Sequence, residues 1–472
     1  MRNLRKSSYL IAVPLQNTEG KHMLVHGYTG AIDIASKDIA ECLNSHAGFC
    51  SEDEIDLPQA TLDTLVARGY FTEKTATEEK AHIQQWASLF HKSLRKFQDF
   101  LFMVTYDCNF RCPYCYESAI SADGRQWTKK TFSKEMVDRA YQAMLEIEPD
   151  INFHNKHITL YGGEPLLKEN KEIVEYIVKQ GADRGYNFSA ITNGYALKEY
   201  EDLLDPTLIR DIQITLDGDK EAHELRRYDY RTHESFDIIF ENIGLALNKG
   251  VYVRIRMNID ANNTEEINKL KAKFKEAGYM NNKLFNFHFA LLHSKENLMI
   301  NSSNPEKANS YSEKDSTFMS RKRFNELFDE SGEVTIQDYG IYDKLQRAIQ
   351  NKGYLNFQSV FCAVQTNEYI FDPYGEIYGC WETVGKKKYT LGSYKDTLSW
   401  TPEADNWRRR HVGVTPKCSG CKYALLCGGG CLARALEANG GEYISSYCDG
   451  YPDTFRIIAN QVYKKVVVQK QQ

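Results

Sequence analysis

The chain carries CNFRCPYC at residues 108–115, a stretch in which three cysteines are spaced CxxxCxxC. It directly follows FLFMVTY (100–106), a continuous apolar run of the kind expected in a strand buried on both faces. Zinc sites prefer four ligands in paired CxxC knuckles, so an isolated group of three thiols fits zinc poorly. Thiolates also bind iron–sulfur clusters, which ordinarily take four protein ligands. Three thiols at a strand end therefore predict a cluster with one iron left open to another ligand.

Five further apolar runs follow, with helical segments between them. The clearest helix is SFDIIFENIGLALNKG (235–250), where Ser235 is predicted to cap the N-terminus and Gly250 to end the helix. Alternating strands and helices predict a parallel sheet with right-handed crossovers, closed or partly closed as a barrel. The five strands are predicted at HITLY (157–161), NFSAIT (187–192), IQITL (212–216), VYVRIRMNI (251–259) and FNFHFALL (285–292).

Polar residues follow these strands at their carboxyl ends, where parallel α/β proteins place their chemistry. They are GGEP (162–165), NG (193–194), DG (217–218), Asn258 and Asp260. Each motif alone is typical of a turn. On the edge that carries three thiols, the set indicates a functional site.

The CxxxCxxC motif and its position after the first strand resemble the radical S-adenosylmethionine (SAM) superfamily, which has a partial (β/α)6 barrel. A structural metal knuckle is the alternative interpretation. The resemblance implies that Cys108, Cys112 and Cys115 hold a [4Fe–4S] cluster, whose open iron binds SAM and whose electron cleaves it to a 5′-deoxyadenosyl radical. This chain has TLDG where relatives often have SLDG, and an arginine at position 227 is more often a surface residue. The implied SAM contacts are Tyr114, Gly162, Gly163, Glu164, Asn193, Thr215, Asp217 and Arg227.

Seven more cysteines lie between residues 362 and 448, four of them within CSGCKYALLCGGGC (418–431). Their spacing resembles the SPASM extension that follows some radical SAM barrels, and a zinc ribbon is the alternative. Two clusters ordinarily need eight thiolates and the region offers seven, so we predict an open or exchangeable site in the second cluster. The resemblance assigns Cys418, Cys421, Cys427 and Cys448 to one auxiliary [4Fe–4S] cluster, and Cys362, Cys380 and Cys431 to the other.

Several neighbouring features have two interpretations. Glu382 is predicted as a candidate base near an auxiliary cluster, and an exposed structural glutamate is the alternative. DPYG (372–375) is predicted to be only the turn that places Cys380. Cys42 and Cys50 are predicted to be buried, inert thiols, although either one could supply the missing ligand.

Residues 1–80 predict a small module of two strands, within 9–14 and 21–26, followed by two helices, the first capped by Ser36. This order resembles a PqqD-like recognition element for ribosomally synthesised, post-translationally modified peptides (RiPPs). Such modules bind an unstructured leader peptide as an added strand. A winged-helix fold for DNA is the alternative, disfavoured by the acidic EDEIDL (52–57) and the lack of a basic helix.

The composition agrees with these motifs. The chain has 472 residues, 42% of them hydrophobic and 26% charged, with a net charge of −5. These values are those of an ordinary globular protein and argue against a nucleic-acid partner or a polybasic membrane patch. Neither a signal peptide nor a stretch of membrane-spanning length is present, so a cytoplasmic location is predicted. Because disulfides are rare there, the clustered cysteines favour metal binding.

The predicted fold class is therefore α/β: a partial (β/α)6 TIM-like radical SAM barrel with an N-terminal winged-helix-like module and a C-terminal iron–sulfur SPASM domain. The predicted boundaries are 1–80 for the leader-binding module, 81–97 for a linker helix, 98–295 for the barrel, 296–355 for a bridging region and 356–472 for the SPASM domain.

The predicted activity is that of an oxidoreductase that modifies a precursor peptide, using SAM, one radical SAM cluster and two auxiliary clusters. It forms a cysteine thioether of the sactipeptide or ranthipeptide type, with flavodoxin or ferredoxin as electron donor. Carbon–carbon crosslinking, decarboxylation and maturation of a folded protein, as by sulfatase maturases, are alternatives. Sulfatase maturases carry an Asp right after the second SPASM cysteine, whereas Cys380 precedes Trp381 and Glu382. A non-radical iron–sulfur electron carrier is the most distant alternative.

Overall fold

The computed structural model describes residues 1–115, 117, 126–292, 319, 321–331, 339–351 and 353–468. It divides the chain into two compact units. Unit 1 comprises Met1–Leu94, Arg321–Gln365 and Arg409–Gln472, and unit 2 comprises Arg95–Ser320 and Thr366–Arg408. Of the predicted bridging region, the helices α9 (Arg321–Ser331) and α10 (Ile341–Gln350) are described, while residues 296–318 lie outside the described residues.

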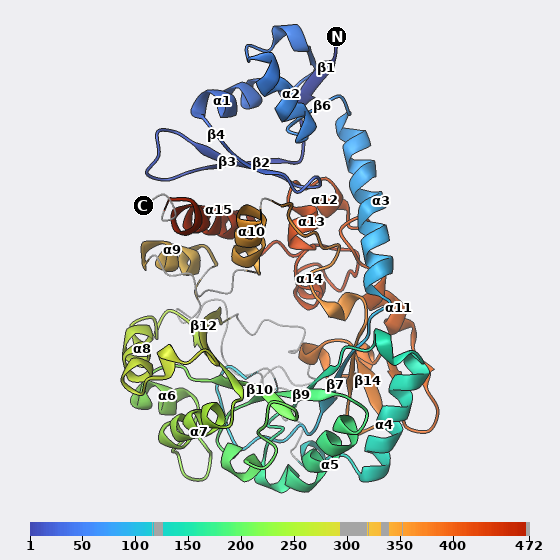
Figure 1. The fold of residues 1–472 in the computed structure, drawn as a ribbon. Helices are drawn as coiled ribbons and strands as arrows, with labels where there is room; N and C mark the ends of the chain where they lie inside the picture. The colour runs from blue at the N-terminus through green and yellow to red at the C-terminus, as the bar shows by residue number, and fades with distance from the viewer. Residues whose placement is uncertain are drawn as a thin grey trace. The chain divides into compact units, whose positions relative to one another are not determined.

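Unit 2 is built on a sheet whose first six strands are parallel and lie in the order β12-β11-β10-β9-β8-β7. Figure 1 shows helices along the outer side of this curved sheet. The strands are β7 (Asp99–Met103), β8 (His157–Tyr161), β9 (Asn187–Thr192), β10 (Ile209–Thr215), β11 (Tyr252–Ile259) and β12 (Phe285–Leu291). The helices are α4 (Lys134–Ile147), α5 (Lys171–Ala182), α6 (Lys220–Arg226), α7 (Phe236–Asn248) and α8 (Glu266–Glu276).

The six strands form where the apolar runs predict them: β7 buries side chains on both faces, whereas β8, β10 and β11 alternate between buried and less buried side chains. In β7, residues 100–103 are all buried. In β11 the apolar side chains of Val253, Ile255 and Met257 are fully buried and alternate with Arg254 and Arg256. The predicted fold class is therefore confirmed for a central parallel α/β sheet.

Four short strands extend this sheet beyond β7. Strand β13 (Glu368–Phe371) pairs with β7 in parallel, and β14 (Glu376–Tyr378), β15 (Gly392–Ser393) and β16 (Ser399–Trp400) follow in antiparallel order. The DPYG turn connects β13 to β14 and does more than turn the chain. Its Asp372 is buried and accepts a hydrogen bond from Tyr106 Oη at 2.8 Å, and burial raises the pKa of this carboxyl to about 6.

The capping of α7 differs from the prediction. Ser235 occupies the N-cap position, but its side chain accepts no capping bond; its hydroxyl donates to the carbonyl of Arg227 at 2.7 Å. The Glu224 carboxylate accepts from the backbone N–H groups of Ser235 and Phe236 instead. A carboxylate from α6 therefore replaces the local cap, which also ties α6 to α7. The predicted end is confirmed, because Gly250 has φ +77° and bonds to Leu247.

The N-terminal part of unit 1 contains two small sheets and three helices. One sheet has the order β5-β1-β6 and the other the order β2-β3-β4. The helix predicted at 81–97 is longer at its start and shorter at its end. The elements are β1 (Asn3–Lys6), β2 (Leu10–Pro14), β3 (His22–His26), β4 (Ile32–Ala35), α1 (Lys37–Ser45), β5 (Cys50–Ser51), α2 (Gln59–Ala67), β6 (Phe71–Thr72) and α3 (Ala76–Leu94). Ser36 is the N-cap residue of α1, but its side chain makes no capping bond.

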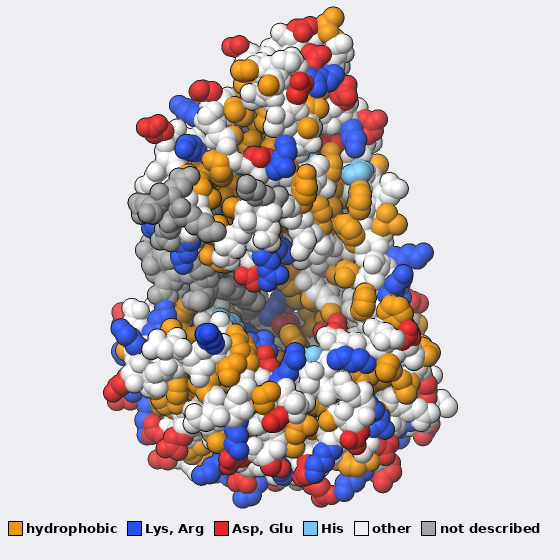
Figure 2. Space-filling view, in the orientation of Figure 1, with side chains coloured by type: hydrophobic (Ala, Val, Ile, Leu, Met, Phe, Trp, Pro, Cys, Tyr) orange, Lys and Arg blue, Asp and Glu red, His pale blue; other side chains and the backbone are white. Residues whose placement is uncertain are grey.

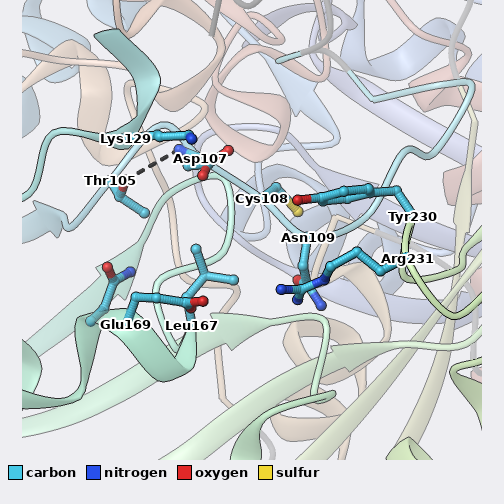
Figure 3. Close-up of a pocket in the computed structure, with 10 residues that line it drawn as sticks. Thr105, Asp107, Cys108, Asn109, Lys129, Leu167, Glu169, Tyr230 and Arg231 are labelled. Carbon is cyan, nitrogen blue, oxygen red and sulfur yellow. Dashed lines mark hydrogen bonds between the residues drawn. The ribbon is translucent and has the colours of Figure 1, made fainter. Parts of the chain in front are cut away.

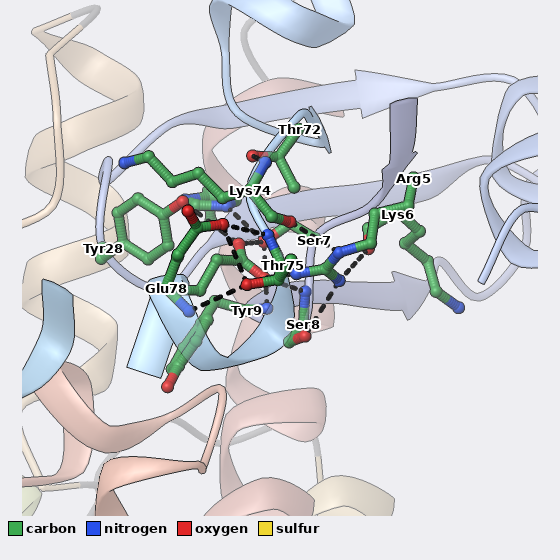
Figure 4. A network of polar contacts seen from close by, with 12 residues as sticks. Arg5, Lys6, Ser7, Ser8, Tyr9, Tyr28, Thr72, Lys74, Thr75 and Glu78 are labelled. Carbon is green, nitrogen blue, oxygen red and sulfur yellow. Dashed lines mark hydrogen bonds and ion pairs between the residues drawn. The ribbon is translucent and has the colours of Figure 1, made fainter. Parts of the chain in front are cut away.

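A buried carboxylate joins α3 to these sheets (Figure 4). Glu79 is fully buried and accepts hydrogen bonds from Arg5 Nη2 at 2.5 Å, Ser7 Oγ at 2.5 Å, the Ser8 N–H at 2.9 Å and Tyr28 Oη at 3.1 Å. Because four donors converge on it, the pKa of Glu79 is lowered in spite of its burial. The network fixes α3 against the N-terminal sheets.

The N-terminal sheets pack onto the cysteine-rich part of unit 1. Tyr9, Ile83, Val412, Cys418 and Leu425 belong to one buried cluster. The backbone N–H of Leu355 also donates to Gly30. The remaining helices of this part are α12 (Pro416–Ser419), α13 (Ala424–Cys427), α14 (Leu432–Ala438) and α15 (Tyr451–Val462), and α11 (Pro402–Arg408) belongs to unit 2.

The surface mixes acidic and basic side chains over the face shown in Figure 2. Within the described residues, none of the helices is both long and apolar enough to cross a bilayer.

Candidate functional site

The three cysteines of the first motif lie in the loop after β7. The N–H of Phe110 points at Cys108 Sγ at 3.3 Å, and the N–H of Cys115 donates to the carbonyl of Cys112 at 3.1 Å, so the loop turns back on itself. Burial raises the pKa of all three thiols, in the case of Cys115 to about 12. Thiolate is the form that binds iron, so positive charge at this position would stabilise it.

Gly162 and Gly163 bring strand β8 into backbone contact with this loop. A Cβ at Gly162 would lie 2.4 Å from Thr105 O, and one at Gly163 would lie 2.3 Å from Asp107 O. The Gly163 N–H donates to Thr105 O at 2.9 Å, and the Glu164 N–H donates to Asp107 O at 2.8 Å. Only glycine fits both positions, and the pairing holds GGEP directly beside the cysteine loop.

Glu164 is 2% exposed and is held by the end of β9. It accepts from Thr192 Oγ1 at 2.6 Å and from the N–H groups of Leu166 and Asn193 at 2.9 and 2.5 Å. Burial raises its pKa. Asn193 in turn donates to Asn109 Oδ1 at 2.8 Å, within the cysteine loop. The polar residues predicted after β8 and β9 therefore meet the loop as one network.

Tyr114, between the last two cysteines, joins a second network. Its hydroxyl donates to Asp217, which is fully buried, and accepts from Arg227 Nη1 at 2.9 Å and Asn258 Nδ2 at 3.3 Å. The Asn258 N–H donates to the other Asp217 oxygen at 3.0 Å. Arg227 is thus turned toward the site. Thr215 ends β10, two residues before Asp217.

The sequence analysis gave no role to Arg226, Asn109 and Arg256. Arg226 forms an ion pair with Asp260 at 2.8 Å, Asn109 Nδ2 donates to Asp229 at 2.9 Å, and Arg256 Nε donates to Asn258 at 2.9 Å. A signal existed for Arg256, because it alternates with Asn258 in VYVRIRMNI and so shares a strand face with it. Nothing in the sequence of α6 indicated that Arg226 faces the site.

The donor set fits SAM. Among the described residues, Arg227 Nε and Arg226 Nη2 are buried and have no hydrogen-bond partner, so both are available to a ligand carboxylate. Glu164 supplies a buried carboxylate near Cys108 for an amino group. The glycine pair leaves room for close backbone approach. These groups suit a zwitterionic amino-acid end beside three thiols.

A polar cavity of about 220 Å³ opens on one side of the cysteine loop (Figure 3). It is lined by Cys108 and Asn109 together with Lys129, Glu169 and Arg231, and charges of both signs therefore surround it. Tyr230 lies beside Cys108, and the Arg111 guanidinium stacks over the Tyr230 ring at 4.3 Å. The cavity places polar groups within reach of the Cys108 side of the loop.

The C-terminal cysteines of unit 1 lie close enough to raise one another's pKa values. None of the twelve cysteines, all of which lie among the described residues, forms a disulfide. Burial raises the pKa of Cys418 to about 11 and that of Cys427 to about 12, and the neighbouring Cys421 and Cys448 contribute to the rise in both. Three thiols thus share one environment with Cys448. Among the described side chains, no group of three or more His, Cys, Asp or Glu is arranged to hold a single metal ion.

The glycine run 428–430 packs tightly next to these thiols. All three glycines have φ between +75° and +88°, a region that favours glycine. A Cβ at Gly428 would lie 2.2 Å from Val360 O, and one at Gly430 would lie 1.8 Å from Tyr447 O. The Gly429 N–H points at the Cys427 sulfur and opposes the rise of its pKa. The predicted tight fold of this run is present.

Cys380 and Glu382 belong to unit 2. Trp381 between them packs on Tyr161, the last residue of β8, with ring centroids 5.6 Å apart. Glu382 is half-buried, not exposed as the structural alternative assumed. Cys42 and Cys50, predicted to be buried, are only partly buried; they pack against the N-terminal hydrophobic core, and burial raises the pKa of both.

Comparison with known proteins gives one family and several relatives. A model described as the Radical SAM superfamily matches residues 102–272. A cysteine-type anaerobic sulfatase-maturating enzyme of Clostridium perfringens (strain ATCC 13124) is 24% identical over 368 residues, 74% of this chain and 92% of that relative. The antilisterial bacteriocin subtilosin biosynthesis protein AlbA of Bacillus subtilis is 22% identical over 351 residues, 72% of this chain and 68% of AlbA.

Two solved structures share the fold. Native anSMEcpe with bound AdoMet and Cp18Cys peptide has a TM-score of 0.56 at 18% identity, covering 79% of this chain and 98% of that one. Streptococcus suis SuiB bound to precursor peptide SuiA has a TM-score of 0.50 at 11% identity, covering 94% and 98%.

The family match covers the cysteine loop, GGEP, Asn193, Asp217 and the arginines of α6. A radical SAM domain implies SAM and a [4Fe–4S] cluster, in agreement with the donor set. Residues 102–272 of this chain therefore form a radical SAM domain.

Proposed function

We propose that this chain modifies a ribosomally made precursor peptide by radical chemistry and forms a cysteine thioether crosslink. The observation that carries the proposal is the combination, in one chain, of a radical SAM domain with a small N-terminal module that has an open strand edge and packs onto the cysteine-rich segment. A relative named for bacteriocin biosynthesis and a fold neighbour bound to a precursor peptide support a peptide substrate.

The edge proposed for the leader is that of β4, on which the Ile32 carbonyl already accepts from Arg68 Nη2 at 2.9 Å. Antiparallel pairs alternate between bonded and non-bonded positions, and His26 bonds to Ala31. Leu24 and Asp33 therefore form the next bonded pair, so the N–H and C=O of Ile34 point away from β3. The Ile34 side chain is 39% exposed. An extended leader peptide can add to this edge through main-chain hydrogen bonds.

In the barrel, Cys108, Cys112 and Cys115 would hold the cluster, and the chain's polar groups would orient SAM. Glu164 would take the amino group, and Arg227 the carboxylate. SAM supplies a 5′-deoxyadenosyl radical that removes a hydrogen atom from a peptide carbon. Asp217 and Glu164 are buried and Tyr114 is partly buried, so water has limited access to these polar groups.

Thioether formation removes two hydrogens from the peptide. One leaves as the abstracted atom; the other leaves as the thiol proton, together with one electron that needs an acceptor. The seven C-terminal cysteines, as ligands of two auxiliary clusters, would supply that acceptor. With seven thiols for two clusters, an exchangeable site is available to a substrate thiolate. Flavodoxin or ferredoxin is the proposed electron donor, and Glu382 the candidate base.

Co-expression with a short, cysteine-containing precursor peptide tests this function by mass spectrometry. We expect a loss of two hydrogens per crosslink and a cysteine that no longer reacts with iodoacetamide. A carbon–carbon crosslink would leave every cysteine reactive, and decarboxylation would remove the mass of CO2. An unmodified leader-bearing peptide, with modification of a folded protein instead, would favour the maturase alternative.

The leader site has its own test. Ile34→Pro removes an N–H that faces the open edge and takes no part in the β3 pairing, and Ile34→Val is the matched control. We expect Ile34→Pro to weaken leader binding at least tenfold in fluorescence anisotropy, with uncoupled SAM cleavage unchanged. Equal binding by both variants would place the leader elsewhere.

A further inference from the structure

Arg410 is one of the largest fully buried side chains in the described part of the chain, and it is 1% exposed. It is the last residue of RRR (408–410) and belongs to none of the predicted motifs. An arginine side chain is rarely buried without a counterion, because removing a guanidinium from water is costly. Its position therefore requires an explanation.

The hydrogen bonds of Arg410 all go to backbone carbonyls. Nε donates to Ser445 O at 2.7 Å, Nη1 to Gly430 O at 2.9 Å and Nη2 to Gly429 O at 2.6 Å. The guanidinium thus holds the glycine run from one side. No carboxylate of the described residues is within ion-pair distance of Arg410, so these three bonds engage each of its nitrogens but leave its charge without a carboxylate partner.

Burial is the largest influence on the Arg410 guanidinium and lowers its pKa; the charged groups that oppose this effect are four cysteines: Cys418, Cys362, Cys431 and Cys427. Gly429 shows how close one of them is. A Cβ at Gly429 would lie 3.4 Å from Arg410 Nη2 and 3.5 Å from Cys418 Sγ, so guanidinium and thiol border the same small space. The four cysteines include members of both sets assigned to auxiliary clusters.

We propose that Arg410 is the buried countercation of the C-terminal cysteine site and raises the reduction potential of the auxiliary clusters bound there. This inference rests on the iron–sulfur assignment made above for those cysteines. Thiolate-ligated clusters carry net negative charge, and adding an electron makes them more negative. A fixed positive charge in a low-dielectric interior stabilises the reduced form more than the oxidised form. Arg410 is therefore a positioning residue for the glycine run and an electrostatic one for the clusters.

The test is a redox titration of the full-length, reconstituted chain, followed by electron paramagnetic resonance. Cys108, Cys112 and Cys115 are all changed to Ala, so that only auxiliary clusters give a signal. Arg410→Met removes the charge at similar volume, and Arg410→Lys keeps the charge but loses the fork of hydrogen bonds. Arg409→Met is the control, because Arg409 is exposed and the change in net charge is the same.

We expect Arg410→Met to lower the reduced-to-oxidised ratio of an auxiliary cluster at least tenfold at fixed potential, a midpoint shift of about 59 mV for one electron. Arg410→Lys should shift it less than half as far, and Arg409→Met should not shift it. If Arg410→Met does not fold, Arg410→Gln replaces it with the same expectation.

Each outcome decides the question. Loading of auxiliary clusters by Arg410→Lys but not by folded Arg410→Met would support a requirement for the charge. Unchanged midpoints in Arg410→Met would overturn the inference and leave the proposed function intact, as would failure of both folded variants to load. A parent chain without auxiliary clusters would overturn the iron–sulfur assignment as well.

Discussion

Gly163→Ala tests the packing that joins the GGEP segment to the cysteine loop. The new Cβ would lie 2.3 Å from Asp107 O, 2.7 Å from Asp107 C and 2.7 Å from Tyr106 O. All three are backbone atoms, so no side-chain rotation relieves the clash. The segment must move away from the loop, and two hydrogen bonds are lost: Gly163 N–H to Thr105 O and Glu164 N–H to Asp107 O.

The magnitude follows from those two bonds. Each contributes about 0.5–1.5 kcal/mol, so the displacement costs about 1–3 kcal/mol. If the segment must return to its native position to bind SAM, affinity falls roughly 5- to 150-fold. The assay is equilibrium binding of SAM to the anaerobically reconstituted chain, with iron content measured to confirm cluster loading.

Gly48→Ala is the matched control, because a Cβ at Gly48 meets nothing within 4 Å and its backbone is not left-handed. It should bind SAM like the parent chain. If Gly163→Ala, fully loaded with iron, also binds SAM with parental affinity, then the close approach of GGEP to the loop does not set the binding geometry, and the reasoning is refuted.

Two stability predictions follow. Burial, with Asp99 opposite, raises the pKa of Glu368 to about 8, so its contribution to stability is full below the unfolded value near 4.5 and is lost as pH rises toward 8. The melting temperature of Glu368→Gln should therefore rise relative to that of the parent as pH increases from 5 to 8, by roughly 2–4 °C for each kcal/mol. A difference in melting temperature that stays constant over this range would contradict the prediction. Arg5→Met leaves the Glu79 carboxylate buried without its ion pair, and we expect a loss of about 3–5 kcal/mol in denaturant unfolding, partly restored by adding Glu79→Gln. A loss below about 1 kcal/mol would show that the pair matters little.

The six barrel strands could be predicted to within a few residues, because β7 is a continuous apolar run and the apolar side chains of β8, β10 and β11 alternate with a period of two. The sheet extension could not: β14 to β16 have two or three residues each, too few for a pattern, and β13 depends on pairing with distant β7. The predicted cap of α7 was wrong for a similar reason, because the group that caps the helix is distant in the sequence. The Glu224 carboxylate, eleven residues before Ser235, accepts the backbone hydrogen bonds that the Ser235 side chain was predicted to accept.

Site residues on strand ends could be predicted because parallel topology brings them to one edge. Arg226 and Arg410 could not, since an arginine in a polar stretch has the same local sequence whether it faces solvent or a buried site. Only the fold shows Arg226 turned toward Asp260 and Arg410 enclosed by glycine carbonyls. Arg410 is fully buried and Arg226 partly buried, whereas a surface neighbour such as Arg409 is exposed.

The most direct test of the central claim is the formation of 5′-deoxyadenosine by the reconstituted chain under anaerobic conditions, with SAM, a reductant and the precursor peptide. The account predicts 5′-deoxyadenosine in proportion to peptide crosslinks for the parent chain, and neither product for Cys112→Ala. Continued 5′-deoxyadenosine formation by Cys112→Ala, or crosslinks formed without it, would contradict the account.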